Sequence, residues 1–260
     1  MSGVFNNKIA LITGSGRGIG KEIALHFAKN GADIVVNFFR NREPAEKVAE
    51  VIKSLGRKTL VVKANMGEIV QIEELFNTIE KEFGGLDIFI SNAASGYNRT
   101  AMEQKPKGWD WTMDINAKSF LFASQLAVPL MEKRSGGKII SITSPGAERV
   151  LPEYVVVGAS KAALNALTRY LAVELAPKNI VVNGISPGVV ATDVMKHFSA
   201  FQDENLLEKI SVNTPVGRLT QPEDIAKVAA FLCSPDAEMI CGQIINVDGG
   251  IALPLKTVGE

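Results

Sequence analysis

The stretch Ile9-Ala-Leu-Ile-Thr-Gly-Ser-Gly-Arg-Gly-Ile-Gly20 decides the fold of this chain. Its first four residues are apolar and predict a short buried strand, which runs directly into a glycine-rich turn and then into a helical pattern. Gly14 and Gly18 permit a tight turn near a phosphate group, and Gly20 permits close packing of the helix. Because a helix N-terminus favours negative charge, the stretch predicts a pyrophosphate site for a dinucleotide rather than a merely structural turn. The expected contacts are Gly14, Ser15, Arg17, Gly18, Ile19 and Gly20.

Six further apolar runs follow along the chain, at Ile34–Val36, Leu60–Val62, Ile88–Ile90, Ile139–Ile142, Ile180–Val182 and Ile244–Val247. They are nearly continuous rather than alternating, which is typical of strands that are covered on both faces of a parallel sheet. Amphipathic helical patterns lie between them. The sequence therefore predicts an α/β Rossmann fold, with a doubly wound seven-stranded parallel sheet and helices on both faces, in a single domain over residues 1–260.

The composition narrows the class of partner. The chain has 28 basic and 28 acidic residues, so its formal net charge is zero and nothing favours nucleic acid or an anionic membrane. No stretch approaches the roughly 20 apolar residues that span a bilayer, and residues 1–8 contain no apolar run of signal-peptide length. Cys233 and Cys241 lack metal-ligand spacing, and two histidines cannot form a metal cluster by themselves. We expect a cytoplasmic protein that binds a small molecule and no metal.

The end of the second strand predicts which dinucleotide binds. A preference for NAD usually requires an acidic residue there, and this chain has Asn37-Phe38-Phe39-Arg40 instead. Without that carboxylate a 2′-phosphate is not repelled, and Arg17 and Arg40 could bind it, with Arg42 a weaker candidate. The sequence thus predicts NADPH; the alternative is that these arginines are solvated surface charges.

Several motifs together resemble the short-chain dehydrogenase/reductase family. They are Thr13-Gly-x-x-x-Gly-x-Gly20, Ser91-Asn92-Ala93-Ala94, Asn116, Lys161 and Ser186-Pro187-Gly188, in that order over nearly the whole chain. The resemblance implies hydride transfer, with Asn92 near the cofactor ribose and Asn116 on the active-site helix. It also implies cofactor contacts from Asn65, Met66, Asn92, Ala93, Lys161, Pro187, Gly188, Val190 and Thr192.

The position of the tyrosine points to a subgroup. Most members of the family carry a tyrosine four residues before the lysine, but here that residue is Val157. The nearby phenol is Tyr154, seven residues before Lys161, which is about two helical turns and returns to nearly the same face. Tyr154-x6-Lys161, the preceding Gly146–Pro152, Asn92–Gly96 and Trp109–Met113 resemble the NADPH-dependent enoyl-acyl-carrier-protein reductases of type III.

This displacement suits conjugate reduction. There the hydride goes to the β-carbon and negative charge develops on the thioester oxygen two carbons away, so the oxygen's donor must lie farther from the nicotinamide. Tyr154 would stabilise that oxygen and Lys161 would hold the nicotinamide ribose. Ser144 stands at the family's usual catalytic serine, where the commonest enoyl reductases have a second tyrosine. The predicted catalytic set is Tyr154, Lys161, Ser144 and Asn116; the structural alternatives are a half-buried tyrosine, an exposed lysine and an asparagine that supports a helix bulge.

Apolar residues between Ala191 and Asn213 predict a substrate lid, although they could also simply pack on the domain. The expected substrate contacts are Tyr97, Met102, Trp111, Tyr154 and Phe198.

Pro152 and Glu153 suit the first turn of a long helix that Tyr154 starts. The resemblance further implies a homotetramer with two long helices, Trp109–Lys133 and Tyr154–Ala176, at its interfaces.

The sequence therefore predicts an NADPH-dependent enoyl-acyl-carrier-protein reductase of bacterial fatty-acid synthesis, whose substrates are thioesters on acyl carrier protein. Two alternatives remain. One is a 3-ketoacyl or other carbonyl reductase of the same family. The other is a non-catalytic dinucleotide sensor that lost the usual tyrosine, because valine at position 157 cannot donate a proton.

Overall fold

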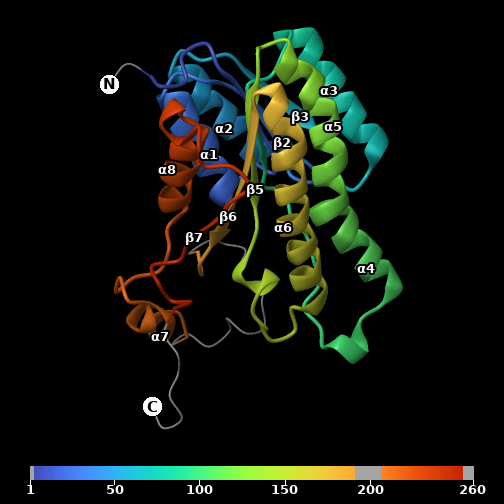
Figure 1. Cartoon of the computed structure of the whole chain (residues 1–260), viewed down its shortest axis with the longest axis vertical. Helices are drawn as coiled ribbons and strands as arrows, with labels where there is room; N and C mark the ends of the chain where they lie inside the picture. The colour runs from blue at the N-terminus through green and yellow to red at the C-terminus, as the bar shows by residue number, and fades with distance from the viewer. Residues whose placement is uncertain (1–2, 191–205, 254–260) are drawn as a thin grey trace.

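A computed structural model describes residues 3–190 and 206–253 of the chain. Its described part contains a seven-stranded sheet in the order β3-β2-β1-β4-β5-β6-β7, in which every neighbouring pair is parallel (Figure 1). The strands are β1 Ile9–Ile12, β2 Asp33–Phe38, β3 Thr59–Lys63, β4 Ile88–Ser91, β5 Gly137–Ile142, β6 Ile180–Pro187 and β7 Ile244–Val247. The predicted fold class is confirmed.

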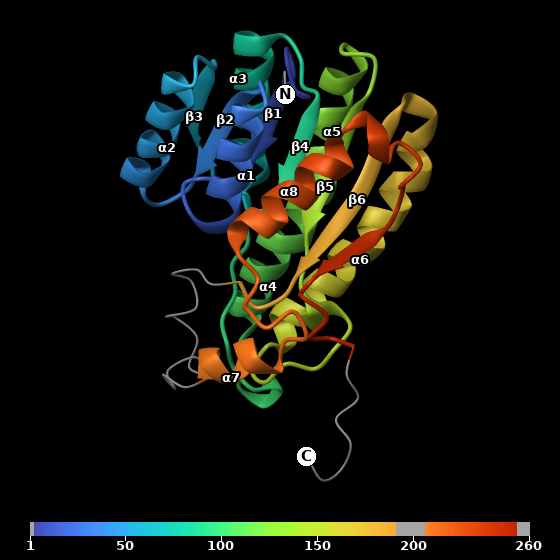
Figure 2. The ribbon, with the colours of Figure 1, turned by 90° about the vertical axis from the view of Figure 1, so that its left-hand side faces the viewer.

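Helices cover both faces of this sheet (Figures 1 and 2). One face carries α1 (Gly18–Lys29), α2 (Arg42–Ser54) and α8 (Pro222–Cys233), and the other carries α3 (Ile69–Phe83), α5 (Ser119–Glu132) and α6 (Val155–Leu175). Successive side chains of a strand point to opposite faces of the sheet. Leu11 accordingly packs with α3, α5 and α6, and Ile12 packs with α1, α2 and α8. Each fully buried side chain of this size contributes about 1.5–3 kcal/mol, so both layers hold the sheet firmly.

The region predicted as one helix over Trp109–Lys133 is interrupted. The structure has α4 (Pro106–Met113), a π-helical segment over Asp114–Lys118, and then α5. Asn116 lies inside the π-helical segment, as the bulge interpretation of this residue predicts. A π-helical turn adds one residue to a turn and re-aims side chains, which is why such segments often lie at functional sites.

The start of the long helix differs from the prediction. Helix α6 begins at Val155, and Tyr154 is its N-cap residue rather than its first residue. Glu153 has a φ of 57°, a left-handed conformation that a right-handed helical turn does not contain. The expectation that Pro152 and Glu153 form the first turn of the helix is therefore wrong.

The predicted lid is described only in part. Its final residues form α7 (Leu206–Asn213), whereas Thr192 and Phe198 lie outside the described residues. No helix in the described part of the chain is long and apolar enough to cross a membrane. Within residues 3–190 and 206–253, no group of three or more histidine, cysteine, aspartate or glutamate side chains could hold a metal ion.

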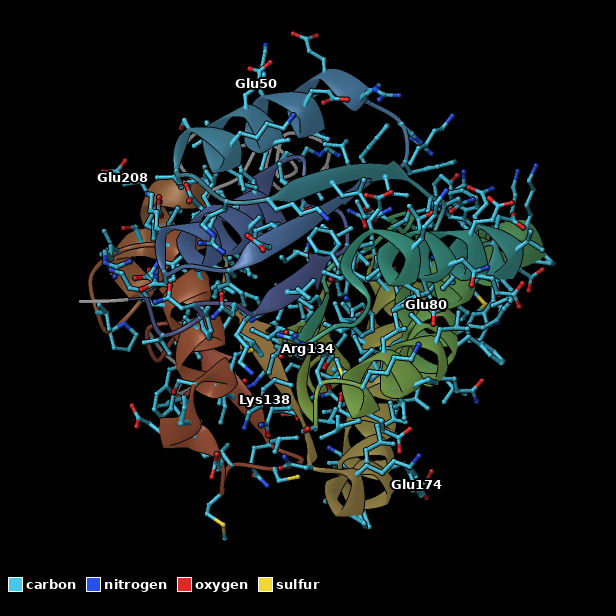
Figure 3. All side chains as sticks on the ribbon, turned by 90° about the horizontal axis from the view of Figure 1, so that it is seen from above. Glu50, Glu80, Arg134, Lys138, Glu174 and Glu208 are labelled. Atoms are coloured by element: carbon cyan, nitrogen blue, oxygen red, sulfur yellow. The ribbon has the colours of Figure 1, made fainter. Side chains whose placement is uncertain are left out.

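Charged groups are distributed around the periphery. Glu50, Glu80, Glu174 and Glu208 are exposed on four different helices (Figure 3). Basic side chains are interspersed with them, and several form exposed pairs four residues apart on one helix, such as Arg42 with Glu46. This mixture agrees with the zero net charge of the chain.

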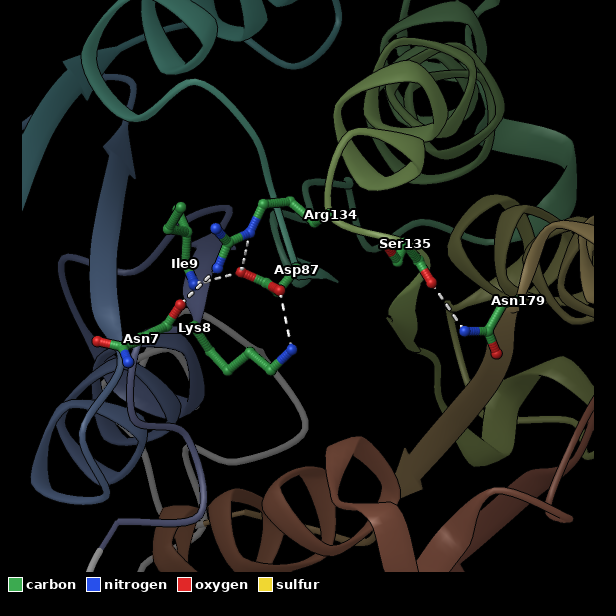
Figure 4. Close-up of polar contacts among 7 residues, drawn as sticks. All are labelled: Asn7, Lys8, Ile9, Asp87, Arg134, Ser135 and Asn179. Carbon is green, nitrogen blue, oxygen red and sulfur yellow. Dashed lines mark hydrogen bonds and ion pairs between the residues drawn. The ribbon is translucent and has the colours of Figure 1, made fainter.

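Asp87 ties together the ends of β1, β4 and α5 on the far side from the glycine turn (Figure 4). Its carboxylate is 3% exposed and accepts hydrogen bonds from Lys8 Nζ (3.0 Å), Ile9 N (2.9 Å) and Arg134 Nε (3.2 Å). Arg134 Nη2 also donates to the Asn7 carbonyl at 2.6 Å. This carboxylate thus satisfies a buried backbone donor at the start of a central strand.

Replacing Asp87 with alanine should lower the free energy of unfolding by about 2 kcal/mol, because a buried donor that loses its acceptor costs about 1–3 kcal/mol. Chemical denaturation monitored by circular dichroism measures this difference. Glu50→Ala, which removes an exposed carboxylate on α2, serves as the control and should change stability by less than about 0.5 kcal/mol. Equal effects of the two substitutions would contradict a stabilising role for Asp87.

Candidate active site

The glycine turn is held in shape from the neighbouring strand. Gly14 and Gly18 have φ values of 64° and 56°, as their predicted roles require. The Thr13 hydroxyl accepts hydrogen bonds from Asn92 N and Ala93 N, both at 3.0 Å, and the Asn92 side-chain amide donates to the carbonyls of Thr13 (2.8 Å) and Gly14 (3.3 Å). Asn92 therefore braces the turn, a role that sequence reasoning missed together with that of Thr13.

The turn leaves the N-terminus of α1 suited to an anion. Arg17 is its N-cap residue but makes no capping hydrogen bond, and the first turn of the helix contains no acidic residue. A Cβ atom at Gly20 would lie 2.5 Å from Asn92 Nδ2 and 2.7 Å from the Gly14 carbonyl oxygen, so only glycine lets the helix approach this closely. Uncapped backbone N–H groups behind a tight turn fit the pyrophosphate of a dinucleotide.

The end of β2 contains a second bracing residue. The Asn37 side chain is buried; its Oδ1 accepts from Gly14 N at 3.1 Å, and its Nδ2 donates to the Ala64 carbonyl at 3.2 Å. This amide thus joins the ends of β1, β2 and β3. The buried position of an asparagine at the end of an apolar strand could have indicated such a role from the sequence.

The candidate phosphate-binding arginines differ in their surroundings. Arg17 and Arg40 are exposed, and the Arg40 guanidinium lies 6.0 Å from the centre of the Phe39 ring. Arg42 is paired with Glu46 at 2.9 Å, which partly neutralises it. The structure thus leaves Arg17 and Arg40 at the site's edge, and makes Arg42 the weaker candidate.

Asn65, Met66, Pro187, Gly188 and Val190, five of the other predicted cofactor contacts, lie at or just after the carboxyl ends of strands. Asn65 and Met66 follow β3 and are buried, with Asn65 Oδ1 accepting from Gly67 N at 3.0 Å. Pro187 ends β6, and Val190 forms an isolated bridge with Thr220. A Cβ atom at Gly188 would lie 2.8 Å from Asp248 Cα, so this segment packs tightly on the chain after β7. This edge of an open parallel sheet is where such folds bind ligands.

Tyr154 and Ser144 meet at the end of β5. The Tyr154 hydroxyl donates a hydrogen bond to Ser144 Oγ at 3.3 Å, and Gly146 N donates to the same oxygen at 3.2 Å. The tyrosine ring lies on Gly146, where a Cβ atom would be 2.5 Å from Cε1 of the ring. Burial raises the pKa of the Tyr154 phenol, and the hydrogen bond with Ser144 opposes part of that rise. The phenol is therefore protonated at neutral pH and can donate.

The Lys161 side chain contacts β5 at Ile142, two residues before Ser144. Its Nζ donates to the Ile142 carbonyl at 2.7 Å, and the side chain is fully enclosed. Burial lowers the pKa of the Lys161 ammonium group to about 8. A buried amine whose pKa lies near the working pH is typical of an active site, since a purely structural lysine would remain at the surface.

Val157 occupies the helical position one turn before Lys161. It is 8% exposed, and its Cγ2 atom would lie 2.3 Å from a Cβ atom on Gly96. The loop after β4 thus packs directly against this valine. The phenol hydroxyl that lies beside Ser144 at the carboxyl end of β5 comes from Tyr154.

Asn116 connects the loop after β4 to α6 by hydrogen bonds. Its Oδ1 accepts from Ser95 N at 2.8 Å, and its Nδ2 donates to the Ser95 carbonyl and to Ser160 Oγ, both at 2.9 Å. Ser160 Oγ in turn donates to the Val157 carbonyl at 2.7 Å. The structure therefore places Asn116 in the segment Asp114–Lys118, bonded to Ser160 of α6. Its side chain is occupied by this network, its catalytic role stays a prediction, and sequence reasoning missed Ser95 and Ser160.

Three of the predicted substrate residues, Tyr97, Met102 and Trp111, lie on the chain between β4 and α5. Tyr97 is 49% exposed, Met102 is 92% exposed on a short 3₁₀ turn over Ala101–Glu103, and Trp111 on α4 is partly buried. Trp111 points toward the loop rather than away from it, because its Nε1 donates to Ser95 Oγ at 2.9 Å. Arg99 N bonds the Glu153 carbonyl at 2.9 Å, which links the loop after β4 to the segment before Tyr154.

Comparisons with known proteins cover nearly the whole chain. A family model described as "Enoyl-(Acyl carrier protein) reductase" matches residues 14–252. The 7alpha-hydroxysteroid dehydrogenase of Escherichia coli is 39% identical over 252 residues, which are 94% of this chain and 94% of the relative. A hydroxynaphthalene reductase-like protein of Metarhizium robertsii is 35% identical over 253 residues, again 94% of each chain.

Solved structures that resemble this chain include enzymes of the same kinds. A 7α-hydroxysteroid dehydrogenase complexed with NADH and 7-oxo glycochenodeoxycholic acid has a TM-score of 0.90 and 38% identity, covering 95% of this chain and 94% of that one. An L-sorbose reductase of Gluconobacter frateurii complexed with NADPH and L-sorbose has a TM-score of 0.89 and 31% identity, covering 98% of each. These names agree better with carbonyl reduction than with enoyl reduction, and they do not distinguish NADPH from NADH.

The resemblance to type III enoyl reductases is thus not confirmed. The resemblance to the short-chain dehydrogenase/reductase family is confirmed. The family model matches most of the chain, the relatives exceed 30% identity over nearly all of it, and the glycine turn, Ser144 and Lys161 lie together at the carboxyl edge of the sheet. The chain belongs to the short-chain dehydrogenase/reductase family of oxidoreductases.

Proposed function

We propose that this protein is an NADPH-dependent reductase of trans-2-enoyl thioesters carried by acyl carrier protein in bacterial fatty-acid synthesis. The observation that carries the proposal is the position of the phenol. Tyr154 stands at the N-cap of α6, its hydroxyl 3.3 Å from Ser144 Oγ, while the residue one turn before Lys161 is a buried valine. A donor displaced along the helix suits an oxygen two carbons from the atom that receives hydride.

The residues of the glycine turn fit NADPH. Backbone N–H groups at the start of α1 would hold its pyrophosphate, and Arg17 and Arg40 would hold its 2′-phosphate. Lys161, with Pro187, Gly188 and Val190 at the end of β6, would hold the nicotinamide half. When bound, the reduced nicotinamide supplies the hydride.

The side chains at the end of β5 would then manage the negative charge on the substrate. When substrate binds, the Tyr154 hydroxyl would turn its single proton from Ser144 Oγ to the thioester oxygen, where charge develops, and the Ser144 hydroxyl would then donate to the phenol oxygen and orient it. The Lys161 ammonium group, enclosed in a medium of low dielectric constant, stabilises negative charge more strongly than an exposed lysine could. The enolate then takes a proton from solvent at its α-carbon while the carbonyl of the thioester re-forms, which completes the reduction.

Carbonyl reduction, as in a 3-ketoacyl reductase, is the second candidate. It is favoured by the names of the relatives and by the hydrogen bond between Tyr154 and Ser144, because that serine stands where the family's catalytic serine usually lies. In this alternative the same phenol would protonate the oxygen on the carbon that receives hydride.

Substrate turnover separates the candidates. Purified protein is supplied with NADPH and either crotonyl or acetoacetyl thioester, and absorbance loss at the nicotinamide band is followed. The proposal expects turnover of the crotonyl thioester. Turnover of acetoacetyl thioester alone would establish the second candidate, and tight NADPH binding without turnover of any thioester would indicate a sensor.

Replacing Arg40 with alanine should weaken NADPH binding by about one to two decades and leave NADH binding nearly unchanged, since a charge-assisted contact contributes about 1.5–3 kcal/mol. Isothermal titration calorimetry with both cofactors measures the two affinities. Arg42→Ala is the matched control, because its guanidinium already pairs with Glu46. Equal losses for NADPH and NADH would reject the assignment of Arg40 to the 2′-phosphate.

The assembly is also a proposal. Tyr170 and Val173 are 69% and 77% exposed on α6, and such apolar exposure on a long helix is consistent with a homotetramer that uses α5 and α6 at its interfaces. Light scattering at micromolar concentration should give a mass of four chains. A monomer there would rule out the tetramer.

A further inference from the structure

Trp111 lies between the adenosine end of the proposed cofactor site and the loop that borders the catalytic helix. On one side its ring centre is 6.4 Å from that of Phe39, and the planes are inclined at 48°. On the other side its indole Nε1 donates to Ser95 Oγ at 2.9 Å. A single side chain on α4 thus contacts the end of β2 and the loop after β4.

Both contacts lead further into functional parts of the molecule. Phe39 lies under the guanidinium group of Arg40, at 6.0 Å, and Arg40 is the proposed ligand of the 2′-phosphate. Ser95 is held at its backbone N and O by Asn116, which also bonds Ser160 of α6. Every group between Arg40 and the catalytic helix is therefore in direct contact with the next.

We infer that Trp111 is a positioning residue that couples recognition of the cofactor 2′-phosphate to the placement of the loop at Ser95. This inference rests on the proposed use of NADPH and adds to it a route by which the phosphate reaches the active site. A phosphate on Arg40 draws the guanidinium away from the Phe39 ring, the ring shifts against Trp111, and the indole changes its hold on Ser95. Discrimination between NADPH and NADH then extends to turnover as well as affinity.

A double-mutant cycle tests the hydrogen bond. Trp111→Phe keeps an aromatic ring but removes the N–H group, and Ser95→Ala removes the acceptor while leaving the backbone contacts with Asn116. Each should lower kcat with NADPH by about threefold to tenfold, which corresponds to the net worth of one hydrogen bond. The double variant should lose no more than either single variant, because both remove the same bond.

The matched control is Trp109→Phe, two residues away on the same helix and 45% exposed. It should leave kcat and KM unchanged. Additive losses would show that Trp111 and Ser95 do not act through one bond, and an equal loss of turnover with NADH and NADPH would show a merely structural role; either result overturns the inference.

Fluorescence provides a readout independent of turnover. The chain has two tryptophans, so in Trp109→Phe protein Trp111 is the sole emitter. Saturation with adenosine 2′,5′-bisphosphate should shift or quench its emission, and adenosine 5′-monophosphate, which lacks only the 2′-phosphate, should do so much less. An added Phe39→Leu substitution should abolish the difference. Calorimetry run in parallel separates the failures. Binding of the bisphosphate with no change in emission overturns the coupling alone, whereas no preference for the bisphosphate over adenosine 5′-monophosphate overturns the NADPH proposal and the coupling with it.

Discussion

Replacing Tyr154 with phenylalanine is expected to lower turnover of crotonyl thioester by about 10²–10³, the usual cost of removing one preorganised donor to a developing oxyanion. The substitution removes a single hydroxyl group and keeps the ring that packs on Gly146. NADPH affinity and thermal stability should therefore remain close to those of the unmodified protein. Steady-state kinetics, calorimetry and thermal denaturation measure the three quantities on the same preparation.

Two further variants make this result specific. Tyr170→Phe removes a phenol that is 69% exposed on the same helix, and it should leave turnover unchanged. Ser144→Ala removes the partner of the Tyr154 hydroxyl and should have a smaller effect than Tyr154→Phe, because the phenol itself remains. Near-normal crotonyl reduction by Tyr154→Phe together with an inactive Ser144→Ala would show that the displaced-tyrosine mechanism is wrong.

Replacing Lys161 with methionine is expected to have the second large effect, and on two quantities at once. Methionine retains an apolar stem of similar length but removes the ammonium group, so turnover should fall by at least about 10² and NADPH should bind more weakly. The loss of binding distinguishes this residue from Tyr154, since its proposed contact with the nicotinamide ribose forms before the reaction. Unchanged affinity for NADPH would remove Lys161 from the cofactor site.

The pH dependence of the unmodified protein gives an independent check. Burial places the pKa of the Lys161 ammonium group at about 8, so kcat/KM should fall as the pH rises through that value and the charge is lost. Unfolding would not explain this fall. Because the unfolded chain keeps this proton up to its pKa of 10.5, the free-energy penalty for burying the charged lysine is relieved as the pH rises from 8 to 10.5, and the free energy of unfolding increases over that range. A flat kcat/KM profile from pH 7 to 9 would contradict the need for a charged lysine.

The fold could be predicted because its signals are local. Ile9–Ile12 and the turn after it specify a strand, a tight bend and a helix within twelve residues, and continuous apolar runs locate the other strands. The left-handed conformation of Glu153 could not be predicted in this way, since a glutamate carries no preference for it. The contact between Arg99 N and the Glu153 carbonyl, 54 positions apart, is part of what fixes that turn, and no local pattern reports it.

The same distinction between local signals and distant contacts applies to the residues of the candidate site. The resemblance to the family identifies Lys161 and Ser144, and the structure brings both to β5. The bracing roles of Asn37 and Asn92 depend on partners 23 and 78 positions away, which only the assembled sheet brings near. Trp111 was expected to face substrate, and its hydrogen bond with Ser95 depends on how α4 lies beside a loop from another strand.

The contact between Val157 and Gly96 has a consequence for how this site can change over generations. A tyrosine at position 157 would need space that the loop after β4 fills, and Asn116 and Trp111 both hold that loop in place. Regaining the tyrosine position used by most of the family would therefore require coordinated substitutions in the loop and in both helices.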